Sequence, residues 1–494
     1  MSTQAETRRS PSLTAPLSGF KRLFVDWTMV GGSTAVCHAL GAATSLLLRM
    51  LLSPAQMGVF SAVKMFLSYG NYANLGISKG AVREFNVATG GGDTRAARRG
   101  LRLAFTVNTI SSAIYGCLLC GLGVWMAYEG GDWANAWAVG LIVVGVMAVI
   151  GRYVSFHVTI LRADQRFAVT STLSILEATL TLGFCGLATW LWGLPGLFFG
   201  TLAVMLCSMW FVRRHAAATL GWAFDGGEIR RLIAIGGPIL LAGAGSSLFR
   251  SLDKLMILAY MDDCEFQLGC YSTALLVTGQ LYGLANMLAT VTGPRYGQTY
   301  GNSGSRREAA RLAAQCSELQ AAAMVLPAAI SLLIGPPILG WLLPDYGSGL
   351  SSLTWLVPGF LALMLALPCG QYMIAVGRQR RALAAVLLGT LIGAAGNHIA
   401  LSAGWGLSGV AAATAVGYAS YFAFSAGMSF LVDLSATGRA RYVLMHAIAL
   451  TPTMATAMLL RATTSLPVAI CGVLLAWSAT LLIGWHYGGW RTRK

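Results

Sequence analysis

Long runs of apolar residues alternate with short polar connectors along almost the whole chain. A helix needs about 20 apolar residues to cross the hydrocarbon core of a bilayer. Runs of this kind predict about fourteen transmembrane helices, near residues 27–50, 58–78, 103–127, 135–157, 168–190, 194–212, 232–259, 268–290, 313–334, 351–375, 383–401, 405–432, 442–460 and 465–487. Very short links join the pairs within 168–212 and 383–432, so a miscount of the spans would fall there.

The composition supports a membrane protein. Only 11% of the residues are charged and 56% are hydrophobic, with a mean hydropathy of +0.65. Soluble proteins carry roughly 25% charged residues, because most of their surface faces water. A surface this poor in charge fits lipid instead, and the predicted fold class is an all-α integral membrane protein.

The basic residues give the orientation of the predicted spans. The net charge is +16, with 34 lysines and arginines against 18 acidic residues. With the N-terminus in the cytoplasm, nearly all of the basic residues fall in cytoplasmic connectors and tails, one (Arg461) falls in an outside connector, and five lie within spans. This asymmetry is what the positive-inside rule describes, so both termini are predicted to be cytoplasmic and nucleic acid is not a predicted partner.

The two halves of the chain resemble each other at a spacing near 211–214 residues. Residues 57–61 (MGVFS) align with 268–272 (LGCYS), and 192–196 (WGLPG) align with 405–409 (WGLSG). Six predicted spans separate equivalent points, so both copies have the same orientation in the membrane, as in transporters built from parallel repeats. The predicted divisions are a cytoplasmic tail (1–22), an N-lobe (23–231), a C-lobe (232–440), and two further helices with a cytoplasmic tail (441–494).

With these features the chain resembles the bacterial polysaccharide-transport and O-antigen flippase family of the MATE/MOP-type transporter superfamily. The similar segments are 52–61 (LSPAQMGVFS), 74–78 (NLGIS) with Arg83, and 251–254 (SLDK) leading into 268–272. The resemblance implies two six-helix lobes around a central polar cavity. It also implies transbilayer movement of sugars linked to undecaprenyl pyrophosphate.

Charged residues within the predicted spans are candidate functional residues, because charge is costly inside a bilayer. The candidates for the substrate cavity are Arg49, Lys64, Arg250, Asp253 and Lys254. Guanidinium and ammonium groups are natural partners of a pyrophosphate. Arg49 and Lys64 have an alternative role, in which they reach the outer lipid headgroups. The group at 250–254 has another, an ion pair that only locks the two lobes together.

Two carboxylates within the spans, Glu177 and Glu318, are candidates for coupling transport to an ion gradient. A carboxyl group in a low dielectric can exchange a proton near neutral pH. The alternative for Glu177 is a protonated residue that only packs between helices. No catalytic residues, metal ligands or cofactor are predicted: Cys117 and Cys120 form a C-x-x-C without the second ligand pair of a zinc site, and no P-loop is present.

The sequence therefore predicts a flippase that moves a polyprenyl-pyrophosphate-linked oligosaccharide across the bacterial inner membrane by alternating access, for surface or exopolysaccharide synthesis. The predicted partners are this substrate, membrane lipid and other polysaccharide-assembly proteins. A lipid II flippase and an ion-coupled multidrug exporter of the same superfamily are the alternatives. A membrane polysaccharide polymerase or ligase fits less well, because every outside connector is short.

Overall fold

The chain forms a bundle of long helices in the computed structural model, which describes residues 18–81, 94–131, 133–163, 166–215, 221–462 and 478. The first half holds α1 (Ser18–Leu51), α2 (Pro54–Tyr69), η1 (Gly70–Tyr72), α4 (Thr94–Glu129), α5 (Ala134–Ala163), α6 (Phe167–Leu180), the π-helical turn η2 (Thr181–Cys185) and α7 (Gly186–His215). The second half holds α8 (Gly226–Phe249), α9 (Leu252–Tyr260), α10 (Cys264–Ser303), α11 (Arg306–Leu342), η3 (Pro344–Tyr346), α12 (Gly347–Leu350), α13 (Leu353–Leu365), α14 (Leu367–Ala375), α15 (Gln379–Ser402), α16 (Gly406–Met428), η4 (Phe430–Asp433) and α17 (Ala436–Ala462).

Every predicted span from 27–50 to 442–460 falls on helical structure, and the last one, 465–487, lies outside the described residues apart from Ser478. Among the helices described, eight have both the length and the apolar composition to cross a membrane. One of these, 168–215, contains two predicted spans, and the backbone breaks between them at Gly193 (φ 62°). In the second half, α15 and α16 are separated at Gly406 (φ 61°). Glycine adopts positive φ readily, so both short links occur where the repeated Trp-Gly sequence places them.

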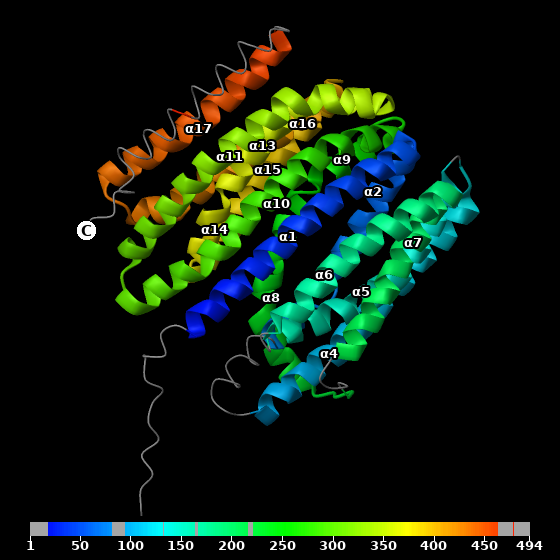
Figure 1. The fold of residues 1–494 in the computed structure, drawn as a ribbon, viewed down its shortest axis with the longest axis horizontal. Helices are drawn as coiled ribbons and strands as arrows, with labels where there is room; N and C mark the ends of the chain where they lie inside the picture. Colours follow the sequence, from blue (N-terminus) through cyan, green and yellow to red (C-terminus); the bar gives the residue numbers. More distant parts are fainter. Residues whose placement is uncertain are drawn as a thin grey trace, which may run out of the picture.

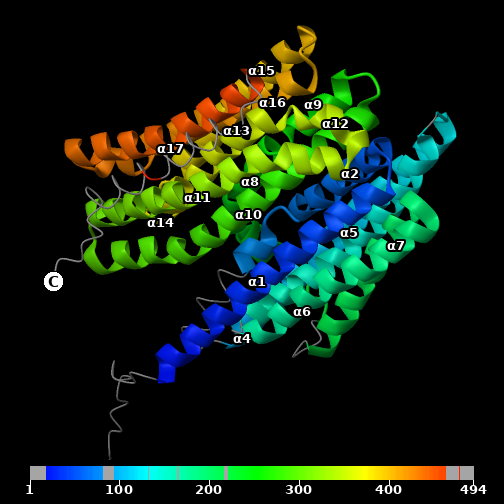
Figure 2. The ribbon, with the colours of Figure 1, turned by 45° about the horizontal axis from the view of Figure 1, so that its top comes forward.

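The helices form two groups, with α4, α5, α6 and α7 on one side and α11, α13, α15, α16 and α17 on the other (Figures 1 and 2). Between the two groups lie α1, α2, α9 and α10. Of these four, α2, α9 and α10 do not meet the length and composition that mark a fully apolar span. Two of these three helices are too short to span alone, since α2 has 16 residues and α9 has 9.

Glycines let α2 and α10 touch at one end of the molecule. A Cβ atom added to Gly58 would lie 1.7 Å from the carbonyl oxygen of Glu265, and one added to Gly269 would lie 1.7 Å from that of Pro54. These residues are equivalent in the repeat, since 58 and 269 differ by the same 211 positions as 54 and 265. The reciprocal contact is what a twofold axis between α2 and α10 would produce, although the lobe boundaries proposed from the sequence remain a prediction.

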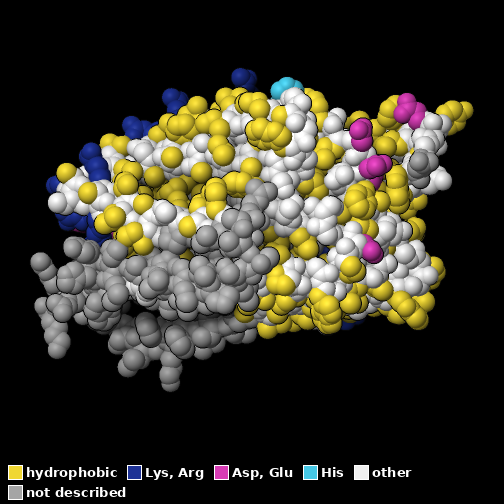
Figure 3. Space-filling model, turned by 90° about the horizontal axis from the view of Figure 1, so that it is seen from above, with side chains coloured by type: hydrophobic (Ala, Val, Ile, Leu, Met, Phe, Trp, Pro, Cys, Tyr) yellow, Lys and Arg dark blue, Asp and Glu magenta, His cyan; other side chains and the backbone are white. Residues whose placement is uncertain are grey.

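Charges separate to opposite ends of the bundle. We call the end that holds Glu129, Asp262, Asp263, Glu265 and Asp345 the acidic end, and the opposite end the basic end. In Figure 3 acidic side chains gather toward one end of the molecule and basic side chains toward the other. Two carboxylates at the basic end share one arginine: Arg99 contacts Asp225 (2.6 Å) and Glu228 (3.0 Å). The backbone N–H of Glu228 and the Arg99 guanidinium hold the pKa of Asp225, the N-cap of α8, below its usual range.

Two arginines at the basic end make the same contact in each half of the chain. Arg166, just before α6, donates to the carbonyl of His215 at the end of α7 (2.7 Å). Arg378, just before α15 and 212 positions later, donates to the carbonyl of Ser429 at the end of α16 (3.3 Å). A guanidinium satisfies the free carbonyls at a helix C-terminus and complements its dipole. The contact extends the internal repeat to a position that the sequence comparison did not include.

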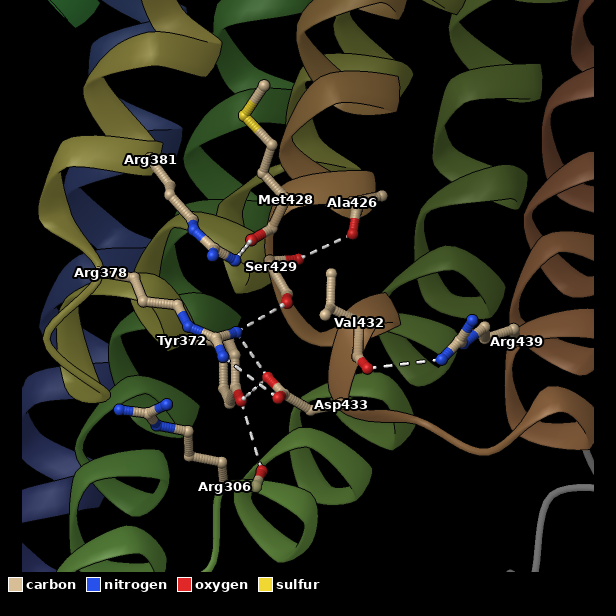
Figure 4. Close-up of polar contacts among 10 residues, drawn as sticks. All are labelled: Arg306, Tyr372, Arg378, Arg381, Ala426, Met428, Ser429, Val432, Asp433 and Arg439. Atoms are coloured by element: carbon tan, nitrogen blue, oxygen red, sulfur yellow. Dashed lines mark hydrogen bonds and ion pairs between the residues drawn. The ribbon is translucent and has the colours of Figure 1, made fainter.

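In the second half this contact is reinforced by Asp433. Arg378 forms a two-pronged ion pair with it, at 2.5 and 3.1 Å, and the Tyr372 hydroxyl donates to the same carboxylate at 2.8 Å (Figure 4). Tyr372 also donates to the carbonyl of Arg306, at the start of α11 (3.3 Å). The cluster thus ties together α14, α15, η4 and α11.

Replacing Arg378 with alanine should destabilise the protein by about 2 kcal/mol, because it leaves a mostly buried carboxylate without its cation. The measurement is thermal unfolding of the purified protein in detergent. Arg381→Ala is the matched control: Arg381 is exposed and donates to one carbonyl, that of Met428. Equal melting temperatures for the two variants would contradict a structural role for the cluster.

Candidate functional site

Arg49 lies near the end of α1 and is almost fully buried, with 8% of its surface exposed. Its guanidinium donates to the carbonyl of Ser45 in its own helix (2.9 Å). It also donates to the carbonyl and hydroxyl of Ser272 (2.9 and 3.1 Å) and to the hydroxyl of Thr273 (3.3 Å), both on α10. Arg49 is therefore turned inward and bridges α1 to α10 rather than extending toward lipid headgroups.

Lys64, Arg250 and Lys254 approach the same interior space from α2 and from the region around α9. Lys64 lies within electrostatic range of Arg49 and Lys254, and its ammonium lies 5.8 Å from the centre of the Phe60 ring. Arg250 occupies the break between α8 and α9, where its guanidinium lies 5.3 Å from the Tyr282 ring centre. Lys254 lies four positions later, in the first turn of α9. Four of the five predicted cavity residues thus converge on one place.

The space that these cations line is a cavity of about 430 Å³ between α1, α2, α9 and α10. Its polar surface consists of the four cations and of hydroxyl groups, and none of the described residues that line it carries a carboxylate or an amide side chain. We call it the central cavity. The hydroxyl-bearing residues that line it are Ser45, Ser61, Ser68, Tyr69, Ser247, Ser251, Ser272 and Tyr282.

A second cavity of about 330 Å³ continues from the central cavity into the first half of the molecule. The two share Ser45, Arg49, Ser61 and Lys64, so Arg49 and Lys64 stand at their junction. The far wall of the second cavity is mainly apolar and includes side chains from α5 and α7. Lys64 is therefore accessible from two connected spaces.

Asp253, the fifth predicted cavity residue, does not line the central cavity. It is buried (1% exposed), and its carboxylate accepts hydrogen bonds from the Tyr271 hydroxyl and from the backbone N–H of Lys254, both at 2.8 Å. Within the described part of the chain, no ion pair joins it to Arg250 or Lys254. Asp253 therefore belongs to the interior of the second half, directly behind the cationic wall.

Glu177 and Glu318 also lie away from the central cavity. Glu177 is on α6, close to Cys37 of α1 and Ser208 of α7. Glu318, on α11, is buried and forms an ion pair with Arg441 of α17, beside a separate cavity of about 300 Å³ at the basic end. The structure thus separates the two candidate coupling residues from each other and from the four cations.

Several contacts close the central cavity at the acidic end. Besides the α2–α10 contact, the indole N–H of Trp137 on α5 donates to Glu265 on α10 (3.0 Å), and the Tyr346 hydroxyl donates to the carbonyl of Leu52 (2.8 Å). Tyr69 on α2 contacts Ser251 at 2.5 Å and so joins the two halves beside the cavity. The sequence did not single out these aromatic residues, because one Trp or Tyr in an apolar run gives no distinctive pattern.

The shape of the chain can be compared with solved structures. It matches an inward-facing multidrug resistance MATE family transporter of the MOP superfamily (TM-score 0.63, 16% identity, 82% of this chain and 95% of that chain). It matches the lipid II flippase MurJ in an inward closed conformation (TM-score 0.66, 12% identity, 92% and 98%). A third match is a MOP superfamily transporter from Pyrococcus furiosus, described as having a binding pocket of reverse polarity (TM-score 0.59, 16% identity, 85% and 95%).

These likenesses define the class: the chain is a multi-pass membrane protein with the fold of the MATE and MurJ transporters. The model of the family described as polysaccharide biosynthesis protein matches residues 46–340, which is more than half of the chain. The chain therefore belongs to this family, as its resemblance to the polysaccharide-transport proteins predicted. None of the curated proteins matches the sequence significantly.

Proposed function

We propose that this protein is a flippase that carries a polyprenyl-diphosphate-linked oligosaccharide from the inner to the outer leaflet of the bacterial inner membrane. The observation that supports this most directly is the convergence of Arg49, Lys64, Arg250 and Lys254 on a cavity without a lining carboxylate. Such a cavity favours an anionic ligand. Membership of a polysaccharide biosynthesis family points to a sugar as the cargo.

The proposed mechanism assigns different parts of the substrate to different surroundings. Among the cations of the central cavity, arginine offers paired donors to the diphosphate and lysine offers a compact charge. The serine and tyrosine hydroxyls of the central cavity bind the sugar, while the polyprenyl tail stays in lipid. The α2–α10 contact closes the acidic end, and at the basic end Gly76 and Gly80 pack against the α8 backbone at Gly236 and Leu232, so loading and release each require one of these contacts to open.

The proposed orientation follows the charges. The basic end, where α1 begins, faces the cytoplasm, and with the predicted span at 465–487 the C-terminus is proposed to be cytoplasmic as well. Without a P-loop in the sequence, energy comes from an ion gradient or the membrane potential. Glu177 and Glu318 remain the proposed coupling residues, and other polysaccharide-assembly proteins are the proposed partners.

A lipid II flippase is the second candidate, because the chain shares its fold with MurJ and because lipid II also contains a diphosphate. A multidrug exporter for cationic drugs fits less well, since four cations in the cavity would repel such a ligand.

The test is deletion of the gene in its host, complemented by the wild-type chain or by Lys64→Glu. We expect lipid-linked oligosaccharides to accumulate on the cytoplasmic leaflet and surface polysaccharide to be lost, with rescue by the wild type only. Accumulation of lipid II and cell lysis would support the second candidate instead. Unchanged polysaccharide together with increased drug sensitivity would refute both flippase functions.

A further inference from the structure

The charge of the central cavity exceeds what a diphosphate can neutralise. Four cationic side chains line it. A diphosphate joined to a lipid on one side and to a sugar on the other has one ionised oxygen on each phosphate, or about two negative charges. With such a ligand bound, two of the four positive charges would remain without a counter-charge.

Asp253 lies within electrostatic range of Lys254, but among the described residues it forms no direct ion pair with any of the four cations. None of the ion pairs among the described residues involves Arg49, Lys64, Arg250 or Lys254. The nearest carboxylate in sequence, Asp253, is turned away toward Tyr271. Cations that lose their water without gaining a partner are costly, so the bound ligand has to provide the balance.

The cations are arranged as two pairs on different walls. Arg49 and Lys64 come from α1 and α2, at the junction with the second cavity. Arg250 and Lys254 come from one wall of the second half, four positions apart. A single diphosphate fits one pair, and the other pair then faces a different part of the ligand.

The remaining polar groups do not resemble a site for an uncharged sugar alone. Among the described residues that line the central cavity, hydroxyl groups are present but Asp, Glu, Asn and Gln are absent. Carboxylate and amide side chains accept hydrogen bonds from sugar hydroxyls, whereas Lys and Arg only donate. The donors in this cavity outnumber the acceptors, which suits a ligand rich in acceptors.

From these observations we infer that the oligosaccharide itself is acidic and carries at least one carboxylate, as in a uronic acid, in addition to the diphosphate. The inference rests on the proposed flippase function and narrows its substrate class. One cation pair holds the diphosphate, and the other selects the sugar carboxylate.

The test compares two synthetic substrates with the same short polyprenyl diphosphate and the same oligosaccharide length, one ending in glucuronate and the other in glucose. Binding is measured to the purified full chain in lipid nanodiscs. We expect the acidic substrate to bind about tenfold more tightly in 0.1 M salt, because it gains one further charge pair in a partly shielded site. The preference should shrink when the salt concentration is raised.

Variants of the two lysines identify which cation pair binds the sugar carboxylate. Lys64→Gln and Lys254→Gln each remove one charge, from different walls, and Arg381→Gln removes an exposed charge outside the cavity. We expect the preference for glucuronate to disappear in one of the two cavity variants, to persist in the other, and to be unchanged in the control. If both cavity variants kept the preference for the glucuronate substrate, neither cation pair would be the site of the sugar carboxylate, and the assignment would be wrong.

Equal affinities of the wild type for the two substrates would overturn the inference while leaving the flippase function intact. Failure to bind either substrate would count against the flippase function itself.

Discussion

Lys64→Glu is expected to abolish translocation, lowering the rate by about 100-fold or more. The change places a negative charge at the junction of the two cavities, where the diphosphate must pass. At about 4 Å and an effective dielectric constant near 20, one charge pair is worth about 4 kcal/mol, so exchanging attraction for repulsion exceeds the 2.7 kcal/mol of a hundredfold effect. The measurement is transport of lipid-linked oligosaccharide in proteoliposomes.

Lys64→Arg should keep most of the activity, because it preserves the charge. Arg381→Glu, an equally severe change at an exposed position, should have little effect. Lys64→Glu that transports at the wild-type rate would show that the substrate does not pass the central cavity. Since Lys64 makes no ion pair among the described residues and lies within electrostatic range of Arg49 and Lys254, the variant is expected to unfold at no lower temperature than the wild type.

Gly58→Leu is expected to push the molecule out of the state closed at the acidic end. A side chain at this position would overlap the backbone of Glu265, so α2 and α10 must separate to accommodate it. Overpacking of this kind costs about 1–3 kcal/mol, which shifts the balance between two conformations by roughly 10- to 100-fold. Transport should fall accordingly, because the carrier no longer returns readily to the state closed at the acidic end.

The conformational shift can be measured directly with Ser272→Cys in a background without other cysteines. Ser272 on α10 contacts Arg49 on α1, and only 5% of its surface is exposed. A membrane-impermeant maleimide added on the side of the acidic end should modify this cysteine at least tenfold faster when Gly58→Leu is also present. The matched control is Gly121→Leu, since Gly121 on α4 has open space around its Cα. Slow modification in both variants would mean that α2 and α10 do not form the gate.

Much of the fold could be predicted from the pattern of apolar and polar residues, because apolar residues favour lipid and polar residues favour water. Apolar runs near 20 residues predicted the helices, and Gly193 and Gly406 occur at the two short links where the repeat placed them. The cationic site was predictable for the same reason. Charges at Lys64, Arg250 and Lys254 are so unfavourable in lipid that an interior cavity is the natural place for them, and the structure puts all three in one.

The orientation of Asp253 could not be predicted from the sequence. Its spacing from Arg250 fits an ion pair on one continuous helix, since residues three apart share a face. The helix is interrupted at Ser251, whose backbone (φ −118°, ψ 2°) is not helical. Asp253 is therefore turned toward Tyr271, a partner 18 residues away on another helix.

Contacts between residues that are far apart in the sequence could not be predicted either. Glu318 and Arg441 are separated by 123 residues, and Arg49 and Ser272 by 223. Nothing local in either stretch indicates such a partner. The Arg49 contact joins α1 to α10, and α10 in turn packs closely on α2 where both helices carry glycine at equivalent positions.

The Arg49 guanidinium has two competing roles, contact with α10 and binding of a phosphate. While it donates to Ser272 and Thr273 it holds α1 against α10, and a phosphate that accepts from the same N–H groups would weaken this contact. The empty carrier therefore keeps the contacts of Arg49 with α10, whereas a bound substrate weakens them. This coupling between substrate binding and the Arg49 contacts would prevent ions from crossing the membrane when the carrier changes conformation without substrate.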